Sequence, residues 1–261
     1  MHRHRVLICT LLTLSAGLAP AAVVTETVLY EHDGVTLEGY IAHDDATGEQ
    51  RPGVLVVHQW MGLSDNERMR AEMLAELGYV ALAVDIYGQG VRPENTDQAR
   101  EQAMKYYGDR ELYRGRLAAG LAELVDHRLV DARRTAAIGY CFGGAGVLEL
   151  ARSGADVRGV VSFHGNLDTT MPAERGEVAA SVLVCHGAVD PYVPAEQVQA
   201  FLEEMETAAV DYQLMMYGGA VHAFTQKGAG DDPSRGAAYQ ATADRRSWRL
   251  MRDFFAEVLD D

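Results

Sequence analysis

The chain has few cysteines, no hydrophobic run long enough to span a membrane, and a shortage of basic residues. Of its 261 residues only 3 are cysteine, and 23 Lys and Arg stand against 38 Asp and Glu, which gives a formal charge of -15. This deficit of positive charge argues against nucleic acid as a partner and favours a soluble, self-repelling surface. The chain also lacks internal repeats, low-complexity tracts and linkers rich in Pro, Gly or Ser, so nothing divides it into separate domains.

The first 21 residues have the pattern of a secretory signal peptide. His2–Arg5 is basic, residues 6–18 are mostly apolar, and Ala19-Pro20-Ala21 offers small residues for cleavage. The apolar stretch is shorter than the ~20 residues that a membrane span needs, so an uncleaved anchor is the weaker alternative. We therefore expect residues 1–21 to be a signal peptide, residues 22–261 to form one domain, and the mature protein to be exported (periplasmic or secreted) without a membrane span.

Apolar runs alternate with helical patterns along the rest of the chain. An alternating pattern around His32-Asp33-Gly34 predicts an antiparallel hairpin, and the later continuous runs are typical of strands covered on both faces. The expected strands are Val23–Tyr30, Val35–Ile41, Gly53–His58, Tyr79–Ile86, Thr135–Tyr140, Gly159–Phe163, Ser181–Cys185 and Tyr212–Met216. Strands that alternate with helices predict an α/β fold, a mostly parallel sheet with helices on both faces.

The helices between these strands have recognisable starts and stops. The first begins at Ser64-Asp65-Asn66-Glu67 and stops at Gly78, with an apolar face formed by Met69, Met73, Leu74 and Leu77. The remaining helices are expected at Pro93–Asp109, Leu112–Leu129, from Gly143 onward, at Ala195–Thr207 and at Ala237–Val258.

Polar side chains gather where the predicted parallel strands end. They are His58, Gln59, Asp85, Cys141, His164, His186, Asp190 and His222. In open α/β sheets the ligand site lies beyond the carboxyl ends of the strands, so these side chains are expected on one rim.

Cys141 carries the most specific local signal. It lies in Gly139-Tyr140-Cys141-Phe142-Gly143-Gly144 after an apolar run, which is the G-x-S-x-G pattern with sulfur in place of oxygen. Glycines flank the nucleophile in this pattern because the sharp strand-to-helix turn leaves no room for a Cβ. A lone pattern of this kind is equally compatible with a buried structural cysteine.

Asp190 and His222 supply partners for that thiol. Each follows a predicted buried strand, and the chain order nucleophile, acid, histidine is that of α/β-hydrolases. An imidazole is needed because the thiolate is the reactive form, and the carboxylate fixes the imidazole's tautomer. All three in order favour a Cys141–Asp190–His222 triad over three unrelated loop residues.

The oxyanion hole is expected to consist of two backbone amides. The amide of Phe142 follows the nucleophile, and the amide of Trp60 lies in the loop after the strand Gly53–His58. Each such donor is typically worth roughly 10²–10³ in rate. His58, His164 and His186 are interpreted as hydrogen-bonded scaffold, with a three-histidine metal site as a remote alternative. We expect no metal and no cofactor.

The cysteines allow one further alternative. Cys9 leaves with the signal peptide, and Cys141 and Cys185 could pair in an exported protein. Both end predicted buried strands about 44 residues apart, and pairing would consume the proposed nucleophile. We therefore expect two free thiols, with Cys185 a small buried core residue.

The motifs together resemble the dienelactone hydrolase family of the α/β-hydrolase superfamily, from about Val23 to the C-terminus. The most specific parts are the Cys141 motif, Leu77–Gly88, His186–Asp190 and His222-Ala223-Phe224. The resemblance implies that Cys141, Asp190 and His222 form the triad. It also implies hydrolysis of a small-molecule ester or lactone through a thioester acyl-enzyme, without a cofactor.

Three positions depart from the pattern of well-studied family members. Gln59 stands where they carry a glutamate that helps to activate the thiol. Gly88, after Tyr87, and the pair Thr225-Gln226 stand where they carry arginines that hold the substrate carboxylate. Arg92 and Lys227 are the nearby candidates to replace those arginines, and with Gln59 and Tyr87 they make up the expected substrate pocket.

We therefore predict a hydrolase of small esters or lactones, acting as a monomer. A general carboxylesterase, a thioesterase or a peptidase on the same fold is the alternative within enzymes, although the segment Gly88–Asp109 is too short for a large cap domain. A non-catalytic binding protein, in which Gln59 marks a decayed site, is the alternative outside them.

Overall fold

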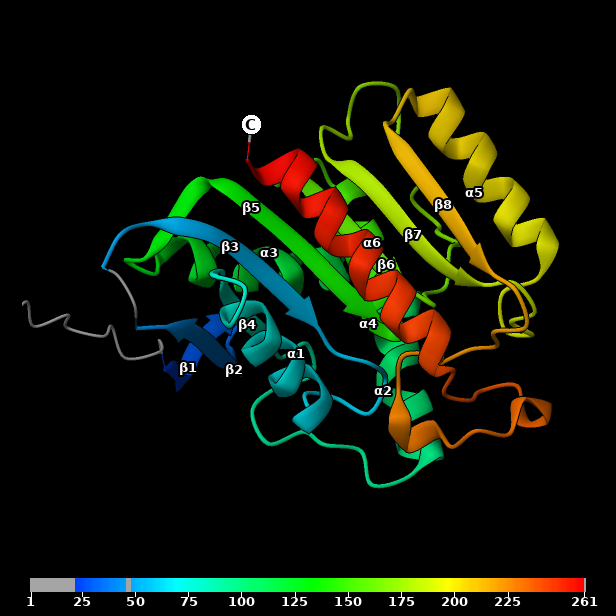
Figure 1. Ribbon diagram of the computed structural model, residues 1–261, viewed down its shortest axis with the longest axis horizontal. Helices are drawn as coiled ribbons and strands as arrows, with labels where there is room; N and C mark the ends of the chain where they lie inside the picture. The colour runs from blue at the N-terminus through cyan, green and yellow to red at the C-terminus, as the bar shows by residue number, and fades with distance from the viewer. Residues whose placement is uncertain (1–21, 46–47, 261) are drawn as a thin grey trace, which may run out of the picture.

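An eight-stranded sheet runs through the protein, for which a computed structural model describes residues 22–45 and 48–260 (Figure 1). Its strands are β1 (Val23–His32), β2 (Val35–Asp44), β3 (Arg51–Val57), β4 (Val80–Val84), β5 (Val130–Tyr140), β6 (Gly159–Phe163), β7 (Ser181–Gly187) and β8 (Tyr212–Tyr217). The order across the sheet is β1-β2-β4-β3-β5-β6-β7-β8. The β1–β2 hairpin and its junction with β4 are antiparallel, and every later pair is parallel. The predicted α/β fold with its N-terminal hairpin is confirmed.

Helices cover both faces of the sheet because its central strands are apolar on both sides. The helices are α1 (Asp65–Ala75), α2 (Thr96–Gly108), α3 (Arg110–Asp126), α4 (Phe142–Arg152), α5 (Ala195–Ala208) and α6 (Ala241–Leu259). The cores show that α1 and α6 pack on one face and α2 to α5 on the other, and α1 and α6 lie in front in Figure 1. In the described part of the chain, no helix combines the length and the apolar character needed to cross a membrane.

The predicted apolar face of the first helix was wrong at two of its four residues. Met69 and Leu77 are 40% and 38% exposed, whereas Glu67 and Arg70 are buried with Leu74. The two charged residues turn inward because each has a partner: Glu67 accepts from the Ser64 N–H in a capping box, and Arg70 pairs with α6. Glu67 and Arg70, whose charges have partners, thus occupy the buried face of the helix, and Met69 lies on the exposed face.

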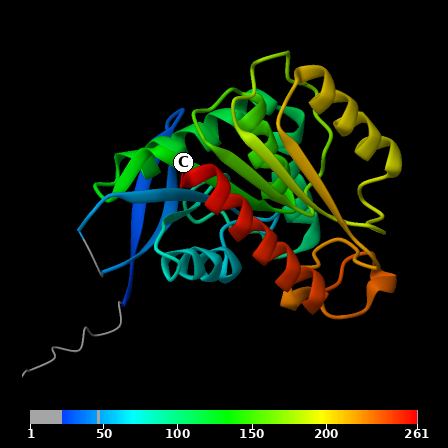
Figure 2. The same ribbon diagram turned by 45° about the horizontal axis from the view of Figure 1, so that its top comes forward.

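Two element boundaries moved for reasons of pairing. Strand β5 begins at Val130 instead of Thr135, because its first residues pair with the start of β3. Helix α6 begins four residues after Ala237, because Ala237 forms an isolated bridge with His222. The predicted signal peptide and Cys9 lie outside the described residues, so cleavage and export stay predictions. Both views place the orange segment between β8 and α6 beyond the carboxyl end of β8 (Figure 2).

Candidate active site

Cys141 lies at a tight turn between β5 and α4. Its backbone has φ 56° and ψ -113°, in the left-handed half of conformational space, and its N–H donates to Phe163 O at 3.0 Å. A Cβ at Gly139 would collide with the backbone of Gly143, and one at Gly143 with the backbone of Val57. The two glycines therefore permit the turn, which presents a half-buried thiol at the N-terminus of α4.

Asp190 and His222 meet Cys141 from the ends of β7 and β8. His222 Nδ1 is 2.9 Å from Asp190 Oδ2, and His222 Nε2 is 3.0 Å from Cys141 Sγ. The Asp190 side chain is fully buried, and its other oxygen accepts from the Tyr192 N–H at 2.9 Å. The His222 N–H donates to Gly236 O at 3.2 Å. The structure thus brings together the three residues that the sequence singled out, in the order thiol, imidazole, carboxylate.

The surroundings favour a charged His222. Burial opposes protonation of the ring, but the Cys141 sulfur and the Asp190 carboxylate outweigh it and raise the pKa of His222 to about 10. At neutral pH the imidazolium therefore donates from Nδ1 to the carboxylate and from Nε2 to the sulfur. A cation beside a thiol favours its thiolate form.

The loop that follows β3 is held by His58 and Tyr87. The N–H of Ile86 donates to His58 Nε2 at 3.2 Å, so Nδ1 carries the proton and donates to Gln59 O at 2.6 Å. Burial lowers the pKa of His58 to about 4, which keeps this ring neutral. The Tyr87 hydroxyl donates to Trp60 O at 2.9 Å. Tyr87 is therefore part of the loop's support.

The two backbone N–H groups expected to form the oxyanion hole have no acceptor among the described residues. Within the part of the chain that the structure describes, neither the Trp60 N–H nor the Phe142 N–H donates a hydrogen bond. The Phe142 ring is fully buried and stacks on Tyr113 at 4.6 Å, and the Tyr113 hydroxyl donates to Phe142 O at 2.8 Å. Both amides are therefore free, and the segments that carry them are fixed.

His164 supports His222 from the end of β6. Its ring lies edge to face on the His222 ring at 5.2 Å, and its Nε2 is hydrogen-bonded to Thr225 Oγ1 at 2.8 Å. Burial and the His222 charge hold the pKa of His164 well below its usual range. These contacts fit the scaffold interpretation for His58 and His164. The buried Nδ1 atoms of His164 and His186 both lack a partner among the described residues. The described residues also contain no cluster of His, Cys, Asp or Glu able to hold a metal ion.

Cys185 is a core residue, as predicted. It is fully buried and free, the Tyr217 hydroxyl donates to its sulfur at 3.8 Å, and burial raises its pKa to about 12. The two thiols of the described chain are therefore not paired.

A groove of about 390 Å³ runs between α1 and the segment after His222. We call it the methionine groove; it is lined by Gln59, Asp65, Asn66, Met69, Arg70, Met73, Thr225, Gln226, Lys227, Gly228 and Asp244. Two of the expected pocket residues, Gln59 and Lys227, lie in it. Sequence reasoning did not predict Met69 and Met73 as groove residues, because it placed both on the buried face of the helix. It did not predict Arg70, because the partners of Arg70 lie far along the chain.

Arg92 does not join this groove. Its Nη1 donates to Val91 O at 2.9 Å and lies 3.6 Å from Asp85 Oδ1, and its Nη2 is 3.8 Å from Glu38 Oε1. Its charge is therefore already paired with carboxylates on the β2 and β4 side of the loop. The structure separates it from Gln59 and Lys227.

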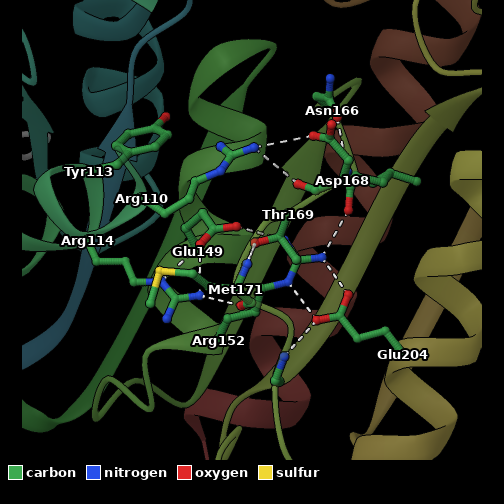
Figure 3. Close-up of polar contacts among 12 residues, drawn as sticks. Arg110, Tyr113, Arg114, Glu149, Arg152, Asn166, Asp168, Thr169, Met171 and Glu204 are labelled. Atoms are coloured by element: carbon green, nitrogen blue, oxygen red, sulfur yellow. Dashed lines mark hydrogen bonds and ion pairs between the residues drawn. The ribbon is translucent and has the colours of Figure 1, made fainter. Parts of the chain in front are cut away.

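A set of ion pairs joins α4 to α3, to α5 and to the segment after His164, and is drawn in Figure 3. We call it the charged wall; it consists of Arg110, Arg114, Glu149, Arg152, Asp168 and Glu204. Arg152 donates to Glu149 Oε1 at 3.1 Å and to Glu204 Oε2 at 2.7 Å, and Arg114 donates to Glu149 Oε2 at 2.9 Å. These contacts fix the segment that follows His164, since Arg152 and Arg114 also donate to the carbonyls of Leu167 and Met171.

Comparison with known proteins places these observations in a family. The sequence model of the "Dienelactone hydrolase family" matches residues 37–259. A solved structure titled "m3DLH" is 40% identical and has a TM-score of 0.87, covering 91% of this chain and 99% of that chain. A dienelactone hydrolase-like promiscuous phosphotriesterase from metagenomic libraries has the same identity and coverage and a TM-score of 0.85. A protein of Yersinia pestis, provisionally named a carboxymethylenebutenolidase, is 26% identical over 86% of this chain and 85% of its own length.

Proposed function

Because the chain belongs to the dienelactone hydrolase family, we propose that it hydrolyses small esters or lactones through a thioester formed on Cys141. The observation that carries the proposal is the pair of contacts of His222, 3.0 Å from Cys141 Sγ and 2.9 Å from Asp190 Oδ2. This arrangement of nucleophile, base and orienting acid is what acyl transfer requires.

The first half of the reaction acylates the enzyme. The Cys141 thiolate attacks the substrate carbonyl carbon, and the carbonyl electrons move onto oxygen, where the free amides of Phe142 and Trp60 stabilise the charge. As the tetrahedral intermediate collapses, the C–O bond breaks and His222 gives its Nε2 proton to the leaving alkoxide. With a lactone, that alcohol stays attached to the acyl group.

The second half releases the acid. Neutral His222 removes a proton from a water molecule, whose oxygen attacks the thioester carbonyl. The C–S bond then breaks, the thiolate returns, and His222 is left protonated as at the start. Asp190, fully buried and fixed by Tyr192, stabilises the imidazolium in each half.

This sequence of steps does not need an acidic residue at position 59. A pKa of about 10 keeps His222 protonated at neutral pH, so the imidazolium itself supports the resting thiolate. Gln59 contributes its backbone carbonyl oxygen, which accepts from His58 Nδ1 and from the Gly62 N–H at 3.0 Å. We therefore propose that Gln59 is compatible with an active enzyme.

The test compares two cysteines. Release of acid from p-nitrophenyl acetate, p-nitrophenyl butyrate and dienelactone is measured for wild type, Cys141→Ala and Cys185→Ala. We expect Cys141→Ala to lose at least about 10³-fold in kcat/KM, as when one member of a triad is removed. Cys185→Ala is the matched control and retains activity. Equal rates for wild type and Cys141→Ala would contradict the proposal.

A rival peptidase activity is tested in the same assay. Peptide p-nitroanilides replace the esters, and the proposal expects turnover of the esters alone. Preferential Cys141-dependent cleavage of the anilides would favour the peptidase alternative.

A further inference from the structure

The methionine groove shares two chain segments with the reactive centre. In one of them Gln59 precedes Trp60, the loop residue that carries a free amide. In the other, Thr225 lies three residues after His222 and is hydrogen-bonded to His164, whose ring contacts the His222 ring. Part of a substrate that is held beside His222 can therefore extend into the groove.

The charges that line the groove cancel. Arg70 and Lys227 are basic, and Asp65 and Asp244 are acidic. Arg70 is buried and donates to Asp244 Oδ1 at 2.8 Å, so its charge is already matched. Lys227 and Asp65 are exposed to solvent, which screens both. A carboxylate in this groove would therefore meet no unmatched buried cation.

Apolar surface and one free amide remain for a ligand. Met69 is 40% exposed and Met73 is half-buried, although both lie on a helix that packs against the sheet. Methionine is flexible and polarisable and adapts to irregular apolar groups. The Nε2 of Gln226 is buried without a hydrogen-bond partner among the described residues, and an uncharged oxygen would satisfy it.

We propose that the methionine groove binds an uncharged alkyl or aryl part of the substrate, on either the acyl or the alcohol side of the scissile bond. The substrate class is then neutral esters or lactones, in preference to carboxylate-bearing ones. Met69 and Met73 set the preference for chain length, and Gln226 donates to a neutral oxygen of the bound group. This inference rests on the proposed function of Cys141.

The experiment measures kcat/KM along two ester series. One is p-nitrophenyl acetate, butyrate and hexanoate, and the other is ethyl, butyl and hexyl acetate. In wild type we expect one series to rise by about two- to fourfold per methylene, the upper value corresponding to full burial of each methylene. Met69→Ser/Met73→Ser is expected to flatten that rise. Met104→Ser, which changes a methionine on α2 that is 57% exposed, keeps it.

A charged probe completes the test. p-Nitrophenyl hemisuccinate has the same number of acyl carbons as the butyrate but ends in a carboxylate, and we expect wild type to favour the butyrate by about tenfold or more. An unchanged chain-length slope in the methionine variant overturns the groove proposal alone. So does a preference for hemisuccinate that Lys227→Gln removes. Absence of Cys141-dependent turnover of every ester overturns the proposed function itself, and the inference with it.

Discussion

The charged wall and the methionine groove are two regions of the molecule that are built in opposite ways. In the wall, the side chains of Glu149 and Arg152 are 0% and 2% exposed, and each makes hydrogen bonds to more than one partner. In the groove, Met69 is 40% exposed and the Gln226 amide has no partner among the described residues. Groups that already have partners hold a shape, whereas free groups are available to a ligand. The wall therefore fixes the segment that follows His164, and the groove is available to a ligand.

The largest effect is expected from breaking the wall. Glu149→Ala removes the carboxylate shared by Arg114 and Arg152 and leaves buried positive charge unmatched. We expect a loss of about 3–5 kcal/mol in the free energy of unfolding, measured by urea denaturation. The control is Asp65→Ala, which removes an exposed carboxylate of the groove and should cost less than about 1 kcal/mol. Similar losses of unfolding free energy in the two variants would contradict the contrast between the charged wall and the methionine groove.

The next effect concerns the reactive centre. Because the pKa of His222 is raised to about 10, the cation beside the sulfur persists between pH 7 and 9, so alkylation of Cys141 by iodoacetamide should be nearly constant over that range. His222→Ala removes the cation beside the sulfur, so labelling at pH 7 should fall about tenfold or more and should then rise with pH.

Cys185, whose pKa burial raises to about 12, serves as the internal control and should stay unlabelled in the folded protein. A wild-type rate for Cys141 that rises tenfold between pH 7 and 8 would show that the charged pair does not form. Such a result would also favour the non-catalytic alternative.

Sequence reasoning reached the reactive centre because its signals are local. The glycines around Cys141 are required by one turn, and Asp190 and His222 each follow an apolar strand, so chain order was enough to place them on one rim. The rim rule also explains why His58 and His164 were found. Their separate roles depend on partners such as Ile86 N–H and Thr225 Oγ1, which lie 28 and 61 residues away.

The periodicity of the sequence could not predict which side chains form the methionine groove and which ones are ion-paired elsewhere. Arg70 turned inward and Met69 outward because Arg70 binds Thr225 O and Asp244, 155 and 174 residues further along the chain. Arg92 lies outside the methionine groove for the same reason, since Glu38 and Asp85 pair with it from other elements. A helical pattern shows which residues are apolar. Which face of the helix is buried also depends on charged partners that lie far along the chain.

A smaller effect is expected where the groove meets the centre. Thr225→Val removes the hydroxyl bonded to His164 Nε2, which is the contact that joins the groove segment to the support of His222. We expect a loss of about 1–3 kcal/mol in stability, because a buried imidazole nitrogen is left without its partner, and a several-fold lower kcat on p-nitrophenyl acetate. Thr225→Ser keeps the hydroxyl and should restore both values. If the serine variant behaves like the valine variant, the methyl group and not the hydrogen bond is what matters.

The smallest effect is expected for Met69→Ala, compared with the same substitution at a methionine that packs in the core. Met205, on α5 beside the wall, is 2% exposed, and Met205→Ala should cost about 2–5 kcal/mol in the free energy of unfolding. Met69→Ala on the groove side should change it by less than about 0.5 kcal/mol, because that side chain is already largely in water. Thermal and urea unfolding of the two variants give the comparison directly. A loss above about 2 kcal/mol for Met69→Ala would mean that this methionine belongs to the core after all, and the groove would then have no apolar wall to offer a substrate.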